Sequence, residues 1–231
     1  HHRYLHCFPT RRSSDLILFF LLFIAISVFG NAQIANQYGI LPSVNLNMKF
    51  PKNWSGNVKV ESRQSIYNQE FGFDYLLTDI SLILTKRIAT NTSAGMGYLM
   101  RVEDGEIKNR AIQQISLVKK YNNFRLAHRF MADQTFEQND DMEFRLRYRL
   151  SSEIPLEGQS LDVNEFYLKV NNEYLNSFQG NVYDLEVRAV ALIGYSLSPL
   201  NNFEIGADYR VDSFINANPR NRFWLCINFF Q

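Results

Sequence analysis

The chain has 231 residues, a formal net charge of +1 and 46% hydrophobic residues. A nearly neutral chain without a dense Lys/Arg patch lacks the positive surface that phosphate backbones require, so we expect no nucleic-acid partner. The length suits a single all-β domain of the barrel type.

The N-terminal apolar run predicts an export signal. Residues 16–30 are almost continuously apolar, follow Arg11 and Arg12, and are succeeded by Ala32, a small residue of the kind that a signal peptidase reads. The run is shorter than the roughly 18–20 apolar residues of a membrane-spanning helix. We therefore expect a cleaved signal peptide over residues 16–33, with a single-pass anchor as the alternative.

Residues 1–15 stand apart from this signal. From Cys7 to Leu16 the sequence resembles a translated sequencing adapter. We expect these fifteen residues to be foreign to the natural protein, and the mature domain to comprise residues 34–231.

The cysteines exclude two kinds of chemistry. Only Cys7 and Cys226 occur, so an exported chain that starts near residue 34 has one thiol and no internal disulfide. No cysteine directly follows the apolar run, so a lipid anchor on such a cysteine is not supported. The Cys/His spacing typical of a structural metal site is also absent. We expect no metal and no cofactor.

Period-two alternation of apolar and polar residues recurs along the mature chain in segments of about ten residues. In residues 142–150 every even position is apolar or aromatic and every odd one is charged, which places the charges on one face of a strand. This repeat is typical of outer-membrane strands. The segments that show it, some more loosely than others, are 43–50, 58–63, 75–87, 93–103, 109–121, 124–136, 142–150, 165–171, 184–196, 203–212 and 222–230.

Eleven such segments conflict with the even number of strands usual in bacterial barrels. We expect ten to twelve strands, and the simplest correction is a short additional strand within residues 33–41, ending at the turn signal around Gly39 and Pro42.

The connections divide into two alternating sets, as expected for an up-and-down barrel with short periplasmic turns and longer external loops. The first set, predicted to be periplasmic, comprises 51–56, 89–92, 122–123, 151–162 and 197–202. The second set comprises 69–74, 103–108, 137–141, 176–182 and 212–221.

One hairpin can be registered from its turn. If Asn122 and Asn123 form a two-residue type I′ turn, which needs positive φ at both positions, Tyr121 faces Phe124. His128 then lies opposite Leu117, Phe130 opposite Ile115 and Arg129 opposite Ser116. A shift by one residue would pair apolar with polar side chains.

Alternation alone also fits a soluble barrel, and three features favour a membrane. The apolar face is rich in Phe and Tyr near the strand ends, nearly every strand alternates, and the chain ends in an aromatic strand after a signal peptide. We therefore expect an antiparallel transmembrane β-barrel in the outer membrane of a Gram-negative cell. Its partners would be outer-membrane lipid, the barrel-assembly machinery during insertion and possible small solutes.

The charged faces are expected to line the lumen, where both signs alternate and can pair across it. Two roles follow: a structural plug of ion pairs, which we favour, or a narrow pore whose arginine-rich wall at Arg145, Arg147 and Arg149 prefers anions. The predicted lumen-lining charged residues are Arg125, Arg129, Asp133, Glu143, Arg145, Arg147, Arg149, Lys169, Glu186, Arg188, Glu204, Asp208 and Arg210, to which the alternation adds Lys59, Glu61, Arg63, Asp79, Glu173 and Asp212.

The pattern resembles the outer-membrane barrels of the family called domain of unknown function 2490, found mostly in Bacteroidetes. The resemblance covers residues 33–231 and implies an outer-membrane location without an established activity. It rests on the arginine-rich strand 144–150, Asn172-Glu173, Gly194-Tyr195, Asp208-Tyr209-Arg210 and Arg222-Phe223-Trp224-Leu225.

An outer-membrane acyl hydrolase is one alternative, because such an enzyme would use a Ser and a His on the lipid-facing wall. His128 is the single histidine beyond the leader, and its predicted neighbour across the hairpin is Leu117 rather than a serine. We therefore expect no catalytic residues and no enzyme activity. A soluble periplasmic ligand binder is the other alternative.

Overall fold

The computed structural model describes residues 35–137, 141–215 and 218–231. The predicted adapter segment 1–15 and signal peptide 16–33 lie outside the described residues. Among the described residues, no helix has the length and apolarity needed to cross a bilayer.

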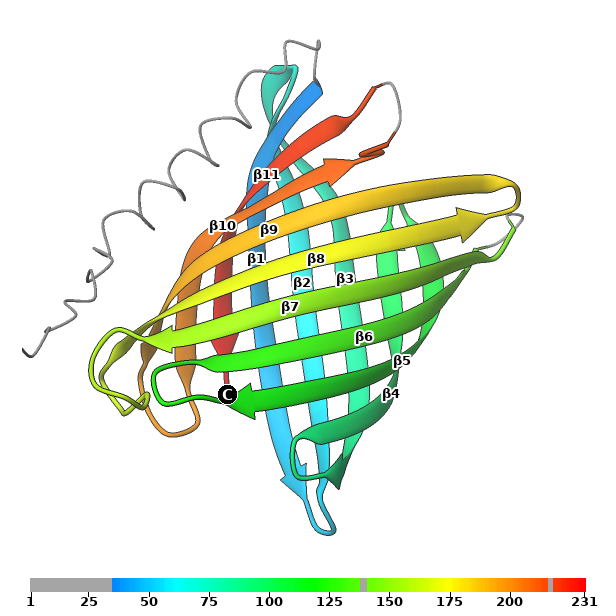
Figure 1. Ribbon diagram of the computed structural model, residues 1–231. Coiled ribbons are helices and arrows are strands. Elements are labelled where there is room, and N and C mark those ends of the chain that lie inside the picture. The colour runs from blue at the N-terminus through cyan, green and yellow to red at the C-terminus, as the bar shows by residue number, and fades with distance from the viewer. Residues whose placement is uncertain (1–34, 138–140, 216–217) are drawn as a thin grey trace, which may run out of the picture. The chain divides into compact units, whose positions relative to one another are not determined.

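Eleven strands close into one barrel, and the predicted all-β barrel is confirmed (Figure 1). Each strand pairs with its neighbours in sequence. The strands are β1 (Ala35–Phe50), β2 (Trp54–Asn68), β3 (Glu70–Ala89), β4 (Thr92–Glu103), β5 (Glu106–Lys120), β6 (Arg125–Phe136), β7 (Glu143–Pro155), β8 (Phe166–Gln179), β9 (Val182–Ser196), β10 (Asn202–Asp212) and β11 (Arg220–Phe230).

The odd strand number has a geometric consequence at the closure. Ten successive antiparallel pairs leave the first and last of eleven strands pointing the same way, so β1 and β11 pair in parallel, from Ala35 with Arg220 to Asn45 with Phe230. The ladder extends one step further, where Gln231 exchanges backbone hydrogen bonds with Asn45 and Asn47.

The predicted additional strand within residues 33–41 is wrong. Gly39 and Pro42 do not end a strand but lie inside β1, which runs unbroken for 16 residues. Because β11 pairs with β1 continuously through this stretch, two-sided pairing overrides the local turn signal. The β1–β2 ladder adjusts with a register shift between Tyr38 and Gly39.

The predicted β5–β6 register is confirmed, although the turn type is not. Leu117 pairs with His128, Ser116 with Arg129 and Ile115 with Phe130. Asn122 and Asn123 are not among the residues with positive φ, so the type I′ assignment is wrong. The register persists because the apolar faces of both strands determine it as strongly as the turn does.

Consecutive positive φ values occur instead in the β1–β2 turn, at Lys52 (60°) and Asn53 (64°), and in the β4–β5 turn, at Asp104 (52°) and Gly105 (80°). Several strands also extend further than predicted. β3 begins at Glu70, because Gln69 (φ 68°) alone reverses the chain, and β8 continues to Gln179. Long tilted strands keep their pairing beyond the point where sequence alternation weakens.

We call the barrel end with the β2–β3 and β4–β5 turns the mouth end, and the opposite end, with Gln231, the C-terminal end. The outer face carries exposed apolar side chains between these ends: Leu82 is 47% exposed, Ile193 53% and Leu225 47%. The buried side chains of the inner face are mostly polar or charged.

An aromatic row crosses the outer face near the mouth end. Tyr209, Phe223, Tyr38, Tyr67 and Phe71 come from β10, β11, β1, β2 and β3 in that order, and successive ring centroids lie 4.7, 5.2, 5.7 and 5.0 Å apart. The row therefore passes directly over the parallel closure.

A second set of aromatic pairs lies near the C-terminal end. The rings of Tyr121 and Phe124 stack at 4.6 Å across the β5–β6 turn, and those of Phe166 and Tyr195 meet at 4.8 Å between β8 and β9. The apolar outer face is thus bounded by aromatic side chains at both ends.

The inner wall combines large side chains with glycines. Trp224 is 2% exposed and packs beside Leu41, Leu192 and Cys226. A Cβ on Gly39, its partner across the β1–β11 ladder, would lie 2.5 Å from the indole ring. Only glycine leaves room for the tryptophan there.

Candidate functional site

Twelve of the thirteen lumen-lining residues named from the sequence are buried or half-buried; Arg125 is exposed. Arg125 is the first residue of β6, at the C-terminal end of the barrel, and pairs with Glu153 at 2.6 Å. The other twelve share two acidic centres and several smaller ion pairs.

The first centre is Asp133 on β6, which is fully buried. Its carboxylate lies 2.6 Å from Arg145 Nε, 2.9 Å from Arg147 Nε and 3.4 Å from Arg110 Nε. We call these four residues the Asp133 cluster. One carboxylate faces three guanidinium groups, and Arg145 Nη2 is buried without a hydrogen-bond partner. Glu143, 3.7 Å from Arg145, adds a partial counter-charge.

The second centre is Glu173 on β8, which is 2% exposed. Arg149 Nε donates to its Oε2 at 2.6 Å, and Arg188 Nη1 donates to its Oε1 at 3.2 Å. Arg129 and Arg147 approach at 3.8 and 3.9 Å. Arg147 thus belongs to both centres and links them.

Toward the mouth end, Glu186 on β9 accepts from Arg188 at 2.6 Å and lies 3.4 Å from Arg222, which also pairs with Asp212. Asp208 and Arg210 pair on the same face of β10 at 2.7 Å. Asp208 and Arg210 are buried, whereas the side chains of the Glu186 group are half-buried.

Toward the C-terminal end, Glu204 accepts from two neighbours. Tyr167 donates its hydroxyl at 2.8 Å and Lys169 its ammonium at 2.7 Å. Glu204 is 2% exposed and Tyr167 1%. These hydrogen bonds connect β8 with β10 across the inner face of β9.

Among the described residues, the ion pairs join positions on one strand, neighbouring strands or strands one apart. They run along the wall rather than bridging opposite sides. The pairs between different strands therefore tie the barrel circumferentially.

Four further inner-wall arginines were not among the predicted site residues: Arg101, Arg110, Arg220 and Arg222. The alternation of 99–103 and 220–228 carries the signal for Arg101 and Arg222. Arg110 was obscured because its inward neighbour Ile112, 4% exposed, is apolar and blurs the alternation of β5.

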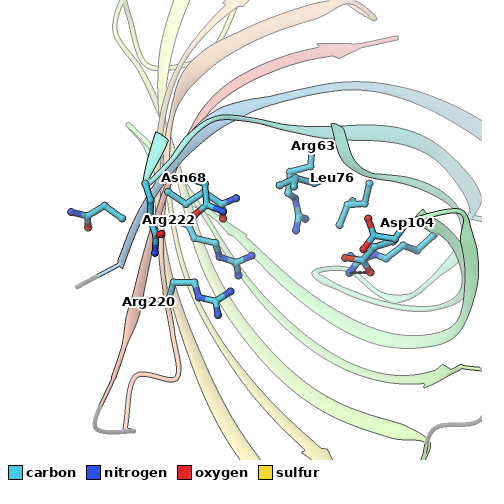
Figure 2. A pocket seen from close by; sticks show the side chains of 12 residues that line it. Arg63, Asn68, Leu76, Asp104, Arg220 and Arg222 are labelled. Atoms are coloured by element: carbon cyan, nitrogen blue, oxygen red, sulfur yellow. Dashed lines mark ion pairs between the residues drawn. The ribbon is translucent and has the colours of Figure 1, made fainter. Parts of the chain in front are cut away.

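A cavity of about 520 Å³ opens into the barrel at the mouth end (Figure 2). β1, β2, β3, β4 and β11, together with the β2–β3 and β4–β5 turns, contribute its lining. Its charged lining residues are Arg63, Arg101, Arg220, Arg222, Glu103 and Asp104.

His128 faces the outer surface. Its Nδ1 lies 2.9 Å from the hydroxyl of Tyr148, and its pairing neighbours across the two adjacent ladders are Leu117 and Leu150. Within the described ranges no group of three or more His, Cys, Asp or Glu side chains is arranged to hold a metal ion.

The comparisons with known proteins bear on family and not on activity. Residues 39–223 match the family described as "Protein of unknown function (DUF2490)". No curated protein and no solved structure matches the chain significantly. The match covers most of the barrel and confirms the predicted resemblance: the chain belongs to the DUF2490 family.

Proposed function

We propose that the protein is an outer-membrane β-barrel with a structural role, closed inside by its ion pairs. The observation that carries the location is the apolar outer face bounded by aromatic side chains at both ends. Tyr and Trp favour the two membrane–water interfaces, because one part of the side chain is apolar and the other forms hydrogen bonds with water.

The spacing of these aromatics fits a bilayer. Tyr183, next to Phe178 near the mouth end, and Tyr195 near the C-terminal end lie twelve residues apart on β9. At about 3.3 Å per residue and a tilt of about 45° they are separated by roughly 28 Å along the membrane normal. The hydrocarbon core of a bilayer is about 30 Å thick.

The buried inner layer supports a structural role over a narrow channel. Asp133 is 0% exposed, Trp224 and Glu173 2%, and Arg110 and Arg210 3%. These residues come from five strands, and side chains lining a continuous water-filled pore would be accessible to water. In this proposal the mouth end faces the cell exterior.

A charge placed in the middle of the outer face tests the location. Leu225→Arg is expected to destabilise the barrel in lipid vesicles by about 2–4 kcal/mol, because arginine must enter hydrocarbon near the midplane. Asn221→Arg, on the same face but at the end of β11, is the matched control and should cost about 0–1 kcal/mol. Guanidinium titration of vesicle-inserted protein gives both values.

The contrary result would be a chain that folds in water without lipid and tolerates both arginines equally. That outcome would favour the soluble ligand binder. Migration on an unheated gel, together with fractionation of the expressed protein with outer membranes, supplies the independent measurement.

Conductance tests the closed interior. In a planar bilayer, the wild-type protein is expected to insert without a steady ion current, because the buried layer leaves no continuous aqueous path. A stable current carried mainly by anions would instead support the narrow channel with the Arg145, Arg147 and Arg149 wall.

A further inference from the structure

We propose that the mouth cavity binds a small ligand bearing a phosphoryl group. This inference deepens the proposed function by naming a ligand class, and rests on it only for the statement that the cavity faces the exterior. The cavity of about 520 Å³ falls within the range of small-molecule sites and exceeds what a single ion occupies.

The charge of the lining favours an anion. Four guanidinium groups and two carboxylates line the cavity. Three of these guanidinium groups also pair with carboxylates behind the lining: Arg63 with Glu61, Arg101 with Asp79, and Arg222 with Glu186 and Asp212. Arg220 lies at the cavity wall in Figure 2. Among the described residues it has no ion-pair partner. Guanidinium groups match the geometry of phosphoryl oxygens and bind them through paired N–H donors.

Buried donors without partners supply the second observation. The Arg63 side chain is 9% exposed, extends into the cavity in Figure 2 and has an Nε without a hydrogen-bond partner. Arg222 Nε is also buried and unpartnered. Both Nε atoms are closed off from the cavity, so a ligand oxygen would meet the part of these guanidinium groups that remains accessible and not the Nε atoms themselves.

The neighbouring groups hold these arginines in place. Arg63 lies 5.7 Å above the Trp224 ring, and its Nη2 donates to Glu61 at 3.3 Å. Arg101 is fixed by two hydrogen bonds to Asp79, at 2.7 and 2.8 Å. The site is therefore organised before a ligand arrives, which reduces the entropic cost of binding.

Neutral donors complete the lining. Gln37, Asn68 and Gln69 line the same cavity and offer amide groups beside the arginines. This combination suits a phosphoryl group attached to a polar, hydroxyl-bearing body. The phosphoryl group could belong to a free solute or to a lipid headgroup.

Tryptophan fluorescence provides the test, because Trp224 lies beneath Arg63. In the Trp54→Phe background, Trp224 is the one remaining tryptophan. Inorganic pyrophosphate is titrated into the refolded full barrel in neutral micelles at constant ionic strength, with sodium chloride as the salt control. We expect a saturable change in emission that chloride does not produce.

Arg220→Gln should weaken pyrophosphate binding about tenfold or more, because one charge-assisted contact is lost. Since Arg220 has no ion pair to lose, the fold should persist. Arg125→Gln at the opposite end is the matched control and should leave the affinity unchanged. A second variant, Arg63→Gln, should weaken binding to a similar degree.

Micelles doped with phosphatidic acid, which carries a phosphomonoester headgroup, distinguish the two sources. A response to pyrophosphate assigns a free solute, and a response to the doped lipid alone assigns a headgroup. An absent response to both, or an equal loss in the Arg220 and Arg125 variants, overturns the site. None of these measurements depends on outer-membrane location. A failure of the ligand site can therefore be distinguished from a failure of the proposed function.

Discussion

Replacing Asp133 by asparagine is expected to destabilise the barrel by about 3–5 kcal/mol, because it removes the one carboxylate that three buried arginines share. Asp133 is fully buried, and Arg145, Arg147 and Arg110 all lie within 3.4 Å of it. Asparagine keeps the shape but not the charge, so Arg110 loses its carboxylate, and Arg145 and Arg147 keep only the more distant Glu143 and Glu173, at 3.7 and 3.9 Å. Urea titration of the vesicle-inserted protein measures the loss.

Glu153→Gln is the matched control, since it removes one carboxylate that also pairs with an arginine. Its partner Arg125 has a side chain that is 53% exposed, so water can solvate the charge that remains. We expect a loss below about 1 kcal/mol. Equal losses at the two sites would mean that the Asp133 cluster is solvated and that the interior is open to water.

Trp224→Ala should cost about 3–5 kcal/mol, because it empties the largest buried side chain of the inner wall. The indole is 2% exposed, packs beside Leu41 and Leu192, and supports Arg63 from below. Its neighbour Gly39 has no side chain with which to fill the space. The free energy of unfolding in vesicles again provides the measurement.

The second tryptophan supplies the comparison for this substitution. Trp54 lies at the C-terminal end of the outer face and is 39% exposed. Trp54→Ala should lose less than half as much stability, because no internal cavity is created. A larger loss at Trp54 than at Trp224 would contradict the close packing inferred for the inner wall.

The inward and outward faces could be predicted because a strand repeats every two residues. Residues 142–150 alternate strictly, and their odd positions are buried or half-buried while Leu146 is exposed. The β5–β6 register followed from the same alternation even though its turn was misassigned. Local periodicity therefore predicted strand positions without any knowledge of distant contacts.

The candidate site could be predicted only in part. Alternation assigned Asp133 and Arg145 to one face, but not the sharing of one carboxylate among three strands. The mouth cavity was not predicted at all, because Arg63, Arg101 and Arg220 come from β2, β4 and β11. Those strands meet only when the barrel closes.

The sequence by itself determined the all-β class, the family and the faces of most strands, because these depend on residues two positions apart. The tertiary structure decided the strand number, the continuity of β1 through Pro42 and the parallel contact between β1 and β11. That contact joins segments about 185 residues apart, and its pairing energy exceeds the local preference for a turn. Closure also sets which charges share the interior, since burial in one lumen is a property of the whole barrel and not of any strand.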